Sequence, residues 1–263
     1  MQAAHLKPDF STVTEQPGQP ATRLQLAMLS ARYGWAAGYA AGKDVAEIAC
    51  GAGLGLGWLA RLATTVEAGD LNDANCRTAQ QTYGARVNIR LRTLDALELP
   101  FPRQSLDLLL LFEAIYYLPD AEGFFREARR VLKPGGMLLI STVNREWSGF
   151  NPSPFSHRYF SASELADALT RHGFGVQVRA GFAERTGLSA SLVDAVRRAA
   201  VALRLIPRTM AGKAFLKRLF YGPLQEIPAE LEPAQGTHGP FVPVPGADLS
   251  RYRVLYAEAR KLP

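Results

Sequence analysis

The chain has 263 residues, 48% of them apolar, which is ordinary for a globular protein built on one large α/β domain. It contains no apolar run of about 18 residues or more, so no membrane-spanning helix is predicted. Two cysteines, Cys50 and Cys76, and four scattered histidines exclude a disulfide framework and lack metal-ligand spacing. We therefore expect a cytoplasmic protein with no signal peptide and no bound metal.

The net charge of +6 is concentrated in one segment. Residues 190–222 hold seven of the 30 Lys and Arg residues and one of the 24 acidic residues, so the remaining chain is balanced. Three interpretations stay open: a solvated face of a lid helix, a contact to an anionic acceptor, or a contact to an acidic membrane surface. Nucleic acid is disfavoured as a partner because aromatic residues are sparse among these charges.

Short apolar strands and helices alternate along the first 182 residues. A polar arm comes first, and apolar residues at helical spacing then predict a helix over 21–41. A capping box, Ser161 to Glu164, starts the last helix of the series, and Pro134-Gly135-Gly136 is expected to stop the one before it. The predicted strands are 44–50, 64–68, 87–91, 106–112, 137–143 and 174–182, and the predicted helices are 54–63, 72–83, 123–132 and 161–172.

This alternation predicts a mostly parallel sheet with helices on both faces. After residue 182 the pattern changes to a basic helical segment, a proline-rich loop and one more strand over 251–259. We therefore divide the chain into an N-terminal arm and lid helix, a core, an insertion and a final strand of the core. These parts are 1–43, 44–182, 183–249 and 250–263. Ligands of such sheets bind beyond the carboxyl ends of the strands.

A glycine-rich stretch, EIACGAGLGLGWLA, begins at Glu47 within the first predicted strand. Glycines at a strand-to-helix turn permit a tight bend and close approach of the backbone to a ligand. A phosphate-binding loop is excluded because Trp58 stands where that loop has lysine. The spacing of Gly51, Gly53 and Gly55 does not fit the dinucleotide fingerprint either.

One element of a nucleotide site is nevertheless present. Asp70 follows the second predicted strand, 19 residues after Gly51, where a carboxylate can accept both ribose hydroxyls. The sequence therefore predicts an adenosine derivative that is bound without a diphosphate.

The pattern Glu47-x-x-x-Gly51-x-Gly53 with Asp70 resembles the class I S-adenosylmethionine-dependent methyltransferases. Two later stretches are similar to the same family in the same order: TLDALELPFPRQSLDLLLLFEAIYYLPD and EARRVLKPGGMLLISTV. The resemblance covers about residues 44–182 and extends to the N-terminal arm of a bacterial small-molecule branch. It implies a Rossmann-like, seven-stranded, mostly parallel sheet whose last strand is antiparallel. It also implies S-adenosyl-L-methionine as cofactor and S-adenosyl-L-homocysteine as product.

The resemblance implies roles for single residues. Glu47 would face the methionine end of the cofactor, Asp70 would bind the ribose, and Asp95 would reach the adenine amino group. From their place late in the N-terminal helix, Arg32 and Tyr33 are expected to close over the cofactor, with an ordinary exposed arginine and a packed tyrosine as the alternative. The other residues that are expected to line the cofactor are Ala49, Gly51, Gly53, Leu71, Ala96, Phe112 and Glu113. Ala49 stands where the family often has glycine.

Acceptor-binding groups are expected on the loops that follow the fourth and fifth strands. His157, in a long aromatic loop, is the predicted base because imidazole titrates near neutrality. Tyr116 is a second predicted catalytic residue. Tyr117, Arg158 and Tyr159 are expected to contact the substrate. A structural role is the alternative for His157, Tyr116 and Tyr117, and Arg158 pairs either with an anionic acceptor or with a carboxylate of this chain.

The sequence therefore predicts an enzyme that methylates O or N of a small molecule, such as a specialised metabolite or a sugar-containing molecule in a biosynthetic route. One alternative is a methyltransferase that acts on RNA or protein. Another is a non-catalytic protein that binds the cofactor or a partner on the same scaffold.

Overall fold

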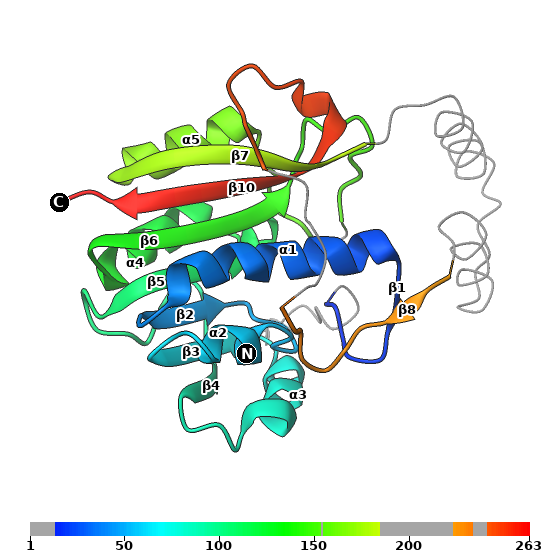
Figure 1. Ribbon diagram of the computed structural model, residues 1–263. Helices are drawn as coiled ribbons and strands as arrows, with labels where there is room; N and C mark the ends of the chain where they lie inside the picture. Colours follow the sequence, from blue (N-terminus) through cyan, green and yellow to red (C-terminus); the bar gives the residue numbers. More distant parts are fainter. Residues whose placement is uncertain (1–13, 154, 185–222, 234–240) are drawn as a thin grey trace, which may run out of the picture.

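The computed structural model describes residues 14–153, 155–184, 223–233 and 241–263, and an eight-stranded sheet runs through them (Figure 1). The strand order is β4-β3-β2-β5-β6-β10-β7-β9. The strands are β2 (Asp44–Ile48), β3 (Thr65–Asp70), β4 (Ile89–Thr93), β5 (Leu106–Phe112), β6 (Leu132–Val143), β7 (Phe174–Ala183), β9 (Val242–Pro243) and β10 (Tyr252–Lys261).

The direction of the strands follows the predicted pattern. Strands β4, β3, β2, β5 and β6 pair in parallel. Strand β10 inserts between β6 and β7 and is antiparallel to both. The predicted Rossmann-like sheet with an antiparallel last strand is therefore confirmed. The two residues of β9 add an eighth, antiparallel strand beside β7, and they come from the predicted insertion.

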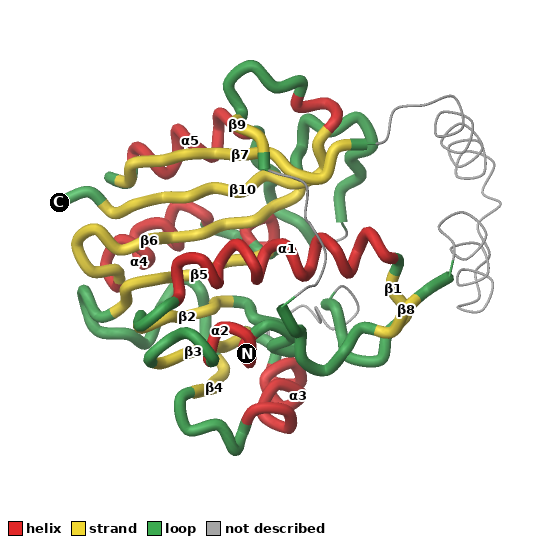
Figure 2. Tube along the Cα trace, in the orientation of Figure 1, coloured by secondary structure: helices red, strands yellow, loops and turns green. Residues whose placement is uncertain are grey.

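Helices cover both faces of the sheet (Figure 2). One face carries α1 (Arg23–Ala40), α2 (Leu56–Ala60) and α3 (Asp73–Tyr83), and the other carries α4 (Ala121–Val131) and α5 (Ala162–Arg171). Leu108 and Leu110 of β5 belong to the core beneath α1 and α2, whereas Leu109 and Leu111 belong to the core beneath α4. Because alternate residues face opposite layers, a strand buried on both sides has an almost continuous apolar sequence.

The predicted start of one helix is confirmed, whereas the predicted stop signal of another is wrong. Ser161 and Glu164 form the predicted reciprocal capping box of α5. Helix α4 instead ends at Val131, and Leu132 already pairs with Leu106. The Pro134-Gly135-Gly136 turn therefore does not stop the helix. It lies inside β6, where the register with β5 shifts and residues 133–136 bulge out.

The described end of the insertion is packed on the N-terminal part of the core. Strand β8 (Gln225–Glu226) pairs with β1 (Pro20–Ala21) of the arm, and Ile227 and Leu231 are buried beside α1 and α2. Glu230 forms ion pairs with Arg61 and Arg86. The basic segment 190–222, for which three interpretations were open, lies outside the described residues.

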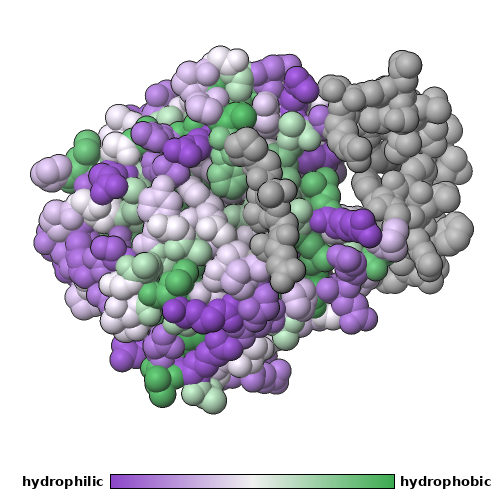
Figure 3. All heavy atoms as spheres, viewed as in Figure 1, coloured by the Kyte–Doolittle hydropathy of each residue, from purple (hydrophilic) through white to green (hydrophobic). Residues whose placement is uncertain are grey.

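The exposed face over α1 to α3 mixes hydrophilic and hydrophobic residues (Figure 3). Large apolar side chains that are exposed, such as Leu62 and Val87, are far apart in the sequence. Within the described ranges, no helix has both the length and the apolar character needed to cross a membrane.

Replacement of Glu230 by glutamine tests whether the ion pairs hold the insertion to the core. Among the described residues, the Glu230 side chain is 18% exposed and pairs with two arginines, whereas that of Glu232 is 71% exposed and pairs with Arg61. Glu230→Gln should lower the free energy of unfolding by about 1 kcal/mol, and Glu232→Gln by a few tenths at most. Urea denaturation measures the free energy of unfolding of both variants. Equal losses in the two variants would contradict the assigned difference.

Candidate functional site

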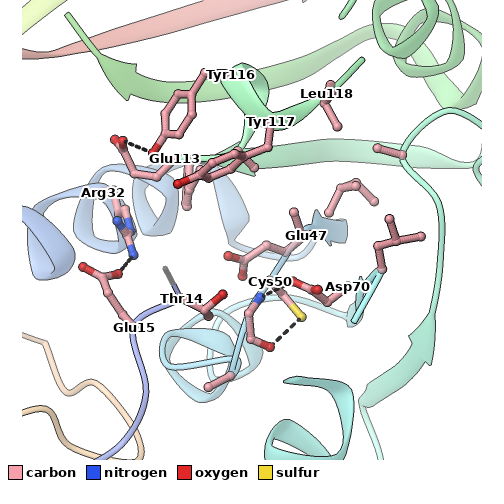
Figure 4. A pocket seen from close by; sticks show the side chains of 18 of the residues that line it. Thr14, Glu15, Arg32, Glu47, Cys50, Asp70, Glu113, Tyr116, Tyr117 and Leu118 are labelled. Atoms are coloured by element: carbon pink, nitrogen blue, oxygen red, sulfur yellow. Dashed lines mark hydrogen bonds and ion pairs between the residues drawn. The ribbon is translucent and has the colours of Figure 1, made fainter. Parts of the chain in front are cut away.

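A cavity of about 630 Å³ lies at the carboxyl ends of β2, β3 and β5, as expected for a parallel sheet (Figure 4). Helix α1, the arm and the short 3₁₀ helix η2 (Ile115–Tyr117) complete its wall. Thirteen predicted site residues line it: Tyr33, Glu47, Ala49, Gly51, Asp70, Leu71, Asp95, Ala96, Phe112, Glu113, Tyr116, Tyr117 and His157. The other three, Gly53, Arg158 and Tyr159, are outside the wall that the described residues form.

The backbone after β2 bends through the left-handed region. Ala49, Gly51 and Gly53 have φ values of 55°, 56° and 76°. Ala49 adopts this conformation at a steric cost, and the glycine found there in the resembling family would avoid it. A Cβ atom on Gly53 would lie 2.8 Å from the Leu56 side chain and 3.0 Å from Ala79. Gly53 therefore allows close packing below the turn, while Gly51 borders the cavity.

Asp70 is held rigidly at the end of β3. Its Oδ2 accepts a hydrogen bond from the Gly51 backbone N–H at 2.9 Å, and its Oδ1 accepts one from the Asn72 N–H at 2.8 Å. Each carboxylate oxygen keeps a second lone pair, so the fixed carboxylate can still accept hydrogen bonds from ligand hydroxyls. Asp95 also lines the cavity, and its Oδ1 closes a turn by accepting from the Leu97 N–H at 2.9 Å.

Glu47 is a carboxyl group buried in the cavity wall, with 2% of its surface exposed. Tyr33 from α1 donates its hydroxyl to Glu47 Oε1 at 2.7 Å. The second oxygen, Oε2, has no hydrogen-bond partner among the described residues. Burial raises the Glu47 pKa to about 7, although the Tyr33 hydrogen bond and the Arg32 charge oppose the rise. A buried polar atom without a partner indicates a position that a ligand group can fill.

The N-terminal arm closes one side of the cavity, which the sequence did not reveal. Glu15 forms an ion pair with Arg32 of α1 (Figure 4). Thr14 packs closely against Gly51. A Cβ atom on Gly51 would lie 2.8 Å from the methyl group of Thr14. Gln16 donates to the Asn75 side chain of α3 at 2.9 Å. The arm thus contacts the glycine turn and two helices.

Other parts of the wall were also missed. Gln25 and Met28 lie on α1, about two turns and one turn before Arg32, and the final strand contributes Val254 and Tyr256. The antiparallel placement of β10 brings its first residues to the ligand-binding edge of the sheet. The stretch RYRVLYAEA, residues 251–259, predicted the strand, but its four consecutive apolar residues, 254–257, do not indicate which of them line a cavity.

Polar and aromatic groups lie together at the end of β5. Tyr116 donates its hydroxyl to Glu113 Oε2 at 3.3 Å, and Tyr117 and Ser153 share a hydrogen bond of 2.8 Å between hydroxyls. His157 lies at the exposed rim, where its backbone N–H donates to the Tyr116 carbonyl at 2.7 Å.

The neighbours of His157 form a layer behind the wall. Tyr159 stacks on Tyr116 with ring centres 4.6 Å apart, and its hydroxyl accepts from the Ser153 N–H at 2.9 Å. The Arg158 guanidinium lies 4.4 Å from the centre of the Phe160 ring. These contacts support the cavity wall and the loop, whereas a substrate contact for either residue stays a prediction.

The lining residues fit a nucleoside with a positively charged amino-acid tail. The described wall residues include five carboxyl groups but one arginine, Arg32. The carboxyl groups belong to Glu15, Glu47, Asp70, Asp95 and Glu113. Two of these groups, Glu47 and Asp70, are buried. Leu71, Leu94 and Ala96 provide apolar surface beside Asp95 for a flat base. In the described part of the chain, no group of three or more His, Cys, Asp and Glu residues could hold a metal ion.

Comparisons with known proteins agree with this geometry. Residues 46–140 match a family model described as a methyltransferase domain. A probable S-adenosylmethionine-dependent methyltransferase from Mycolicibacterium smegmatis is 37% identical over 155 residues, which are 57% of this chain and 58% of that protein. A ubiquinone biosynthesis O-methyltransferase from Bradyrhizobium sp. is 30% identical over 112 residues, or 41% of this chain and 43% of that protein. The chain thus spans about half the length of the curated relatives it matches.

A solved structure shares the fold at low sequence identity. The crystal structure of the cyclase SpnF has a TM-score of 0.59 and 18% identity, and the match covers 95% of this chain and 85% of that chain. This similarity concerns the fold alone.

The raised pKa of Glu47 predicts a pH-dependent stability. The folded protein keeps the Glu47 proton up to about pH 7, whereas the unfolded chain releases it near the ordinary value of 4.5. The stability contributed by this proton is therefore complete at low pH and is lost as the pH rises through that window. Glu47→Gln should raise the free energy of unfolding by at most about 3 kcal/mol at about pH 8 and change it little at about pH 4. Denaturant titrations at both pH values measure this, and a gain that is independent of pH would contradict it.

Proposed function

Because the core of this chain belongs to the class I S-adenosylmethionine-dependent methyltransferase family, we propose that the protein transfers a methyl group to an oxygen or nitrogen atom of a small molecule. The observation that carries this proposal is the cavity at the strand ends. There, the partnerless oxygen of Glu47 and the fixed carboxylate of Asp70 border the same space. The methyl donor is S-adenosyl-L-methionine, and S-adenosyl-L-homocysteine remains after transfer.

The residues of the wall divide into parts for each portion of the donor. Asp70 would hold the ribose hydroxyls, and Asp95 with Leu71 and Ala96 would hold the adenine. Glu47, oriented by Tyr33, would accept a hydrogen bond from the amino group of the methionine tail. When bound, the donor supplies a methyl group on a positively charged sulfur. The surplus of carboxyl groups in the cavity favours this cation electrostatically.

The acceptor would enter between α1, η2 and the first residues of β10. The enzyme's main contribution to such a transfer is to align the two reactants and exclude water. The name of the ubiquinone biosynthesis O-methyltransferase supports an oxygen atom of a small molecule as the acceptor. The carboxyl groups of the wall disfavour an anionic acceptor, which weakens the interpretation of Arg158 as an anion contact. Catalysis by His157 stays a prediction, as does a cytoplasmic location.

Two alternatives differ from the proposed function in the acceptor or in whether methyl transfer occurs at all. SpnF, named as a cyclase, has the same fold, so the fold alone does not establish methyl transfer. A protein that binds the donor without turnover is therefore one rival. An RNA or protein methyltransferase is the other, and its nucleic-acid binding would weaken steeply with salt.

Replacement of Asp70 tests the assignment of the donor site. Asp70→Ala should weaken binding of S-adenosyl-L-homocysteine by about 1–3 kcal/mol, because a hydrogen-bond acceptor for the ribose is lost. It should also lower stability, since the N–H groups of Gly51 and Asn72 lose their acceptor. Asp73→Ala, an exposed aspartate three residues away, is the matched control and should bind normally. Unchanged binding by Asp70→Ala would remove Asp70 from the site.

Transfer of a labelled methyl group tests the reaction itself. The protein is incubated with donor labelled at the methyl carbon and with a panel of phenols, sugars, amines, RNA and protein. The proposal predicts label in an organic-soluble or small polar product, measured by chromatography. Label only in RNA or protein would support the macromolecular rival. Normal donor binding without any labelled product would support the non-catalytic rival.

A further inference from the structure

We propose that Glu113 is the general base of the reaction and that it accepts the proton of an aromatic hydroxyl group on an uncharged acceptor. This inference rests on the proposed methyl transfer and adds the base and the acceptor class to it.

The backbone places the Glu113 side chain in the cavity at a conformational cost. Glu113 follows β5 directly and has a φ value of 52°, in the left-handed region that glycine adopts more easily. Its N–H donates to the Ser141 carbonyl at 2.9 Å, which fixes this bend against β6. Residues held in such strained conformations are concentrated at functional sites. The bend turns the carboxyl group toward α1 and η2 (Figure 4).

The carboxyl group has the surroundings of a base. The Tyr116 hydroxyl lies 3.3 Å from Glu113 Oε2, which is long for a bond between two oxygens, so a ligand hydroxyl can compete for this acceptor. Burial raises the pKa of Glu113, although the Arg32 charge opposes the rise. A pKa that moves toward neutrality makes a carboxylate a better proton acceptor at the pH of the cell.

The other candidate bases are less suitably placed. His157 lies at the exposed rim, where water reaches its ring. Glu47 is buried, but it already accepts the Tyr33 hydroxyl and lies beside the glycine turn on the donor side. Among the described wall residues, Glu113 is the carboxyl group that lies between the tyrosines of η2 and Arg32.

The surface around Glu113 indicates the acceptor class. The neighbouring wall is aromatic and apolar, which suits a flat ring. Its members are Met28, Phe112, Tyr116, Tyr117, Val254 and Tyr256. A second anion would be repelled by the carboxyl groups of the wall, so the hydroxyl should arrive protonated. A phenol meets both conditions, because its hydroxyl stays neutral to about pH 10 in water.

In the proposed step, the acceptor O–H bond breaks and its proton goes to a Glu113 carboxylate oxygen. The electron pair of the acceptor oxygen forms the new bond to the methyl carbon, and the pair of the broken carbon–sulfur bond stays on sulfur. Glu113 then returns the proton to solvent. The products are an aryl methyl ether and a neutral thioether.

The test compares Glu113→Gln with the unchanged protein on phenols of different acidity. A weakly acidic phenol depends strongly on a base, whereas a more acidic phenol that is still neutral at the assay pH depends on it less. Glu113→Gln should slow methylation of the weakly acidic phenol about 100-fold or more and slow methylation of the more acidic phenol less. A loss that is the same for every phenol would assign Glu113 a positioning role and overturn the proposal.

Three comparisons complete the experiment. Glu232→Gln makes the same chemical change at an exposed position outside the cavity and should match the unchanged protein on every phenol. His157→Gln should show a rate loss that does not depend on phenol acidity, and the opposite result would transfer the role of base to His157. Glu113 was also predicted to line the cofactor, and calorimetric titration with S-adenosyl-L-homocysteine distinguishes the two roles. A base predicts similar affinities for the Glu113→Gln protein and the unchanged protein, whereas a clear loss of affinity would assign Glu113 to the donor site. Normal binding without methylation of any phenol would overturn the acceptor class, whereas absence of binding would overturn the proposed function as well.

Discussion

The cavity depends on the burial of one carboxyl group, that of Glu47. Transfer of a carboxylate out of water is costly, and the protein compensates only part of this cost with the Tyr33 hydroxyl. The second oxygen has no hydrogen-bond partner among the described residues, so a donor group on a ligand would offset part of this cost. The same contact fixes α1 over the end of β2, because Tyr33 belongs to that helix. The hydrogen bond between Tyr33 and Glu47 therefore orients a donor-binding group and also holds α1 in place.

The charged groups of the cavity wall also affect the binding of the donor, the release of the product and the choice of acceptor. Five carboxyl groups and one arginine are among the described wall residues, and that arginine, Arg32, pairs with Glu15 of the arm. A positively charged donor gains from this field and a neutral product loses that gain, which favours release after transfer. The same field selects an acceptor that brings no negative charge. The left-handed bends at Ala49 and Glu113 place the backbone and the carboxyl group where the two reactants would meet, at some cost in stability.

Periodicity and order were sufficient to predict most of the fold. The strand Leu106–Phe112 was predicted with its observed bounds because it is buried on both faces and is apolar almost throughout. The turn at Pro134-Gly135-Gly136 was misplaced because turn residues also fit a bulge within a strand. In a sequence, the two arrangements look alike.

The site was less predictable where single polar contacts bring distant segments together. Thr14 and Glu15 carry no periodic signal, and only the folded chain shows that they reach Gly51 and Arg32. Arg158 and Tyr159 were predicted from residue type in a loop, where neither alternation nor helical spacing indicates which side chains face inward.

Calorimetric titration of the unchanged protein with S-adenosyl-L-homocysteine, and with NADH as the control, tests the central claim most directly. Both ligands carry an adenosine, but only the second carries a diphosphate, for which the glycine turn has no fitting spacing. S-adenosyl-L-homocysteine should bind saturably with one-to-one stoichiometry, and NADH should not bind. Binding of NADH, or no binding of either ligand, would contradict the assignment of the cavity.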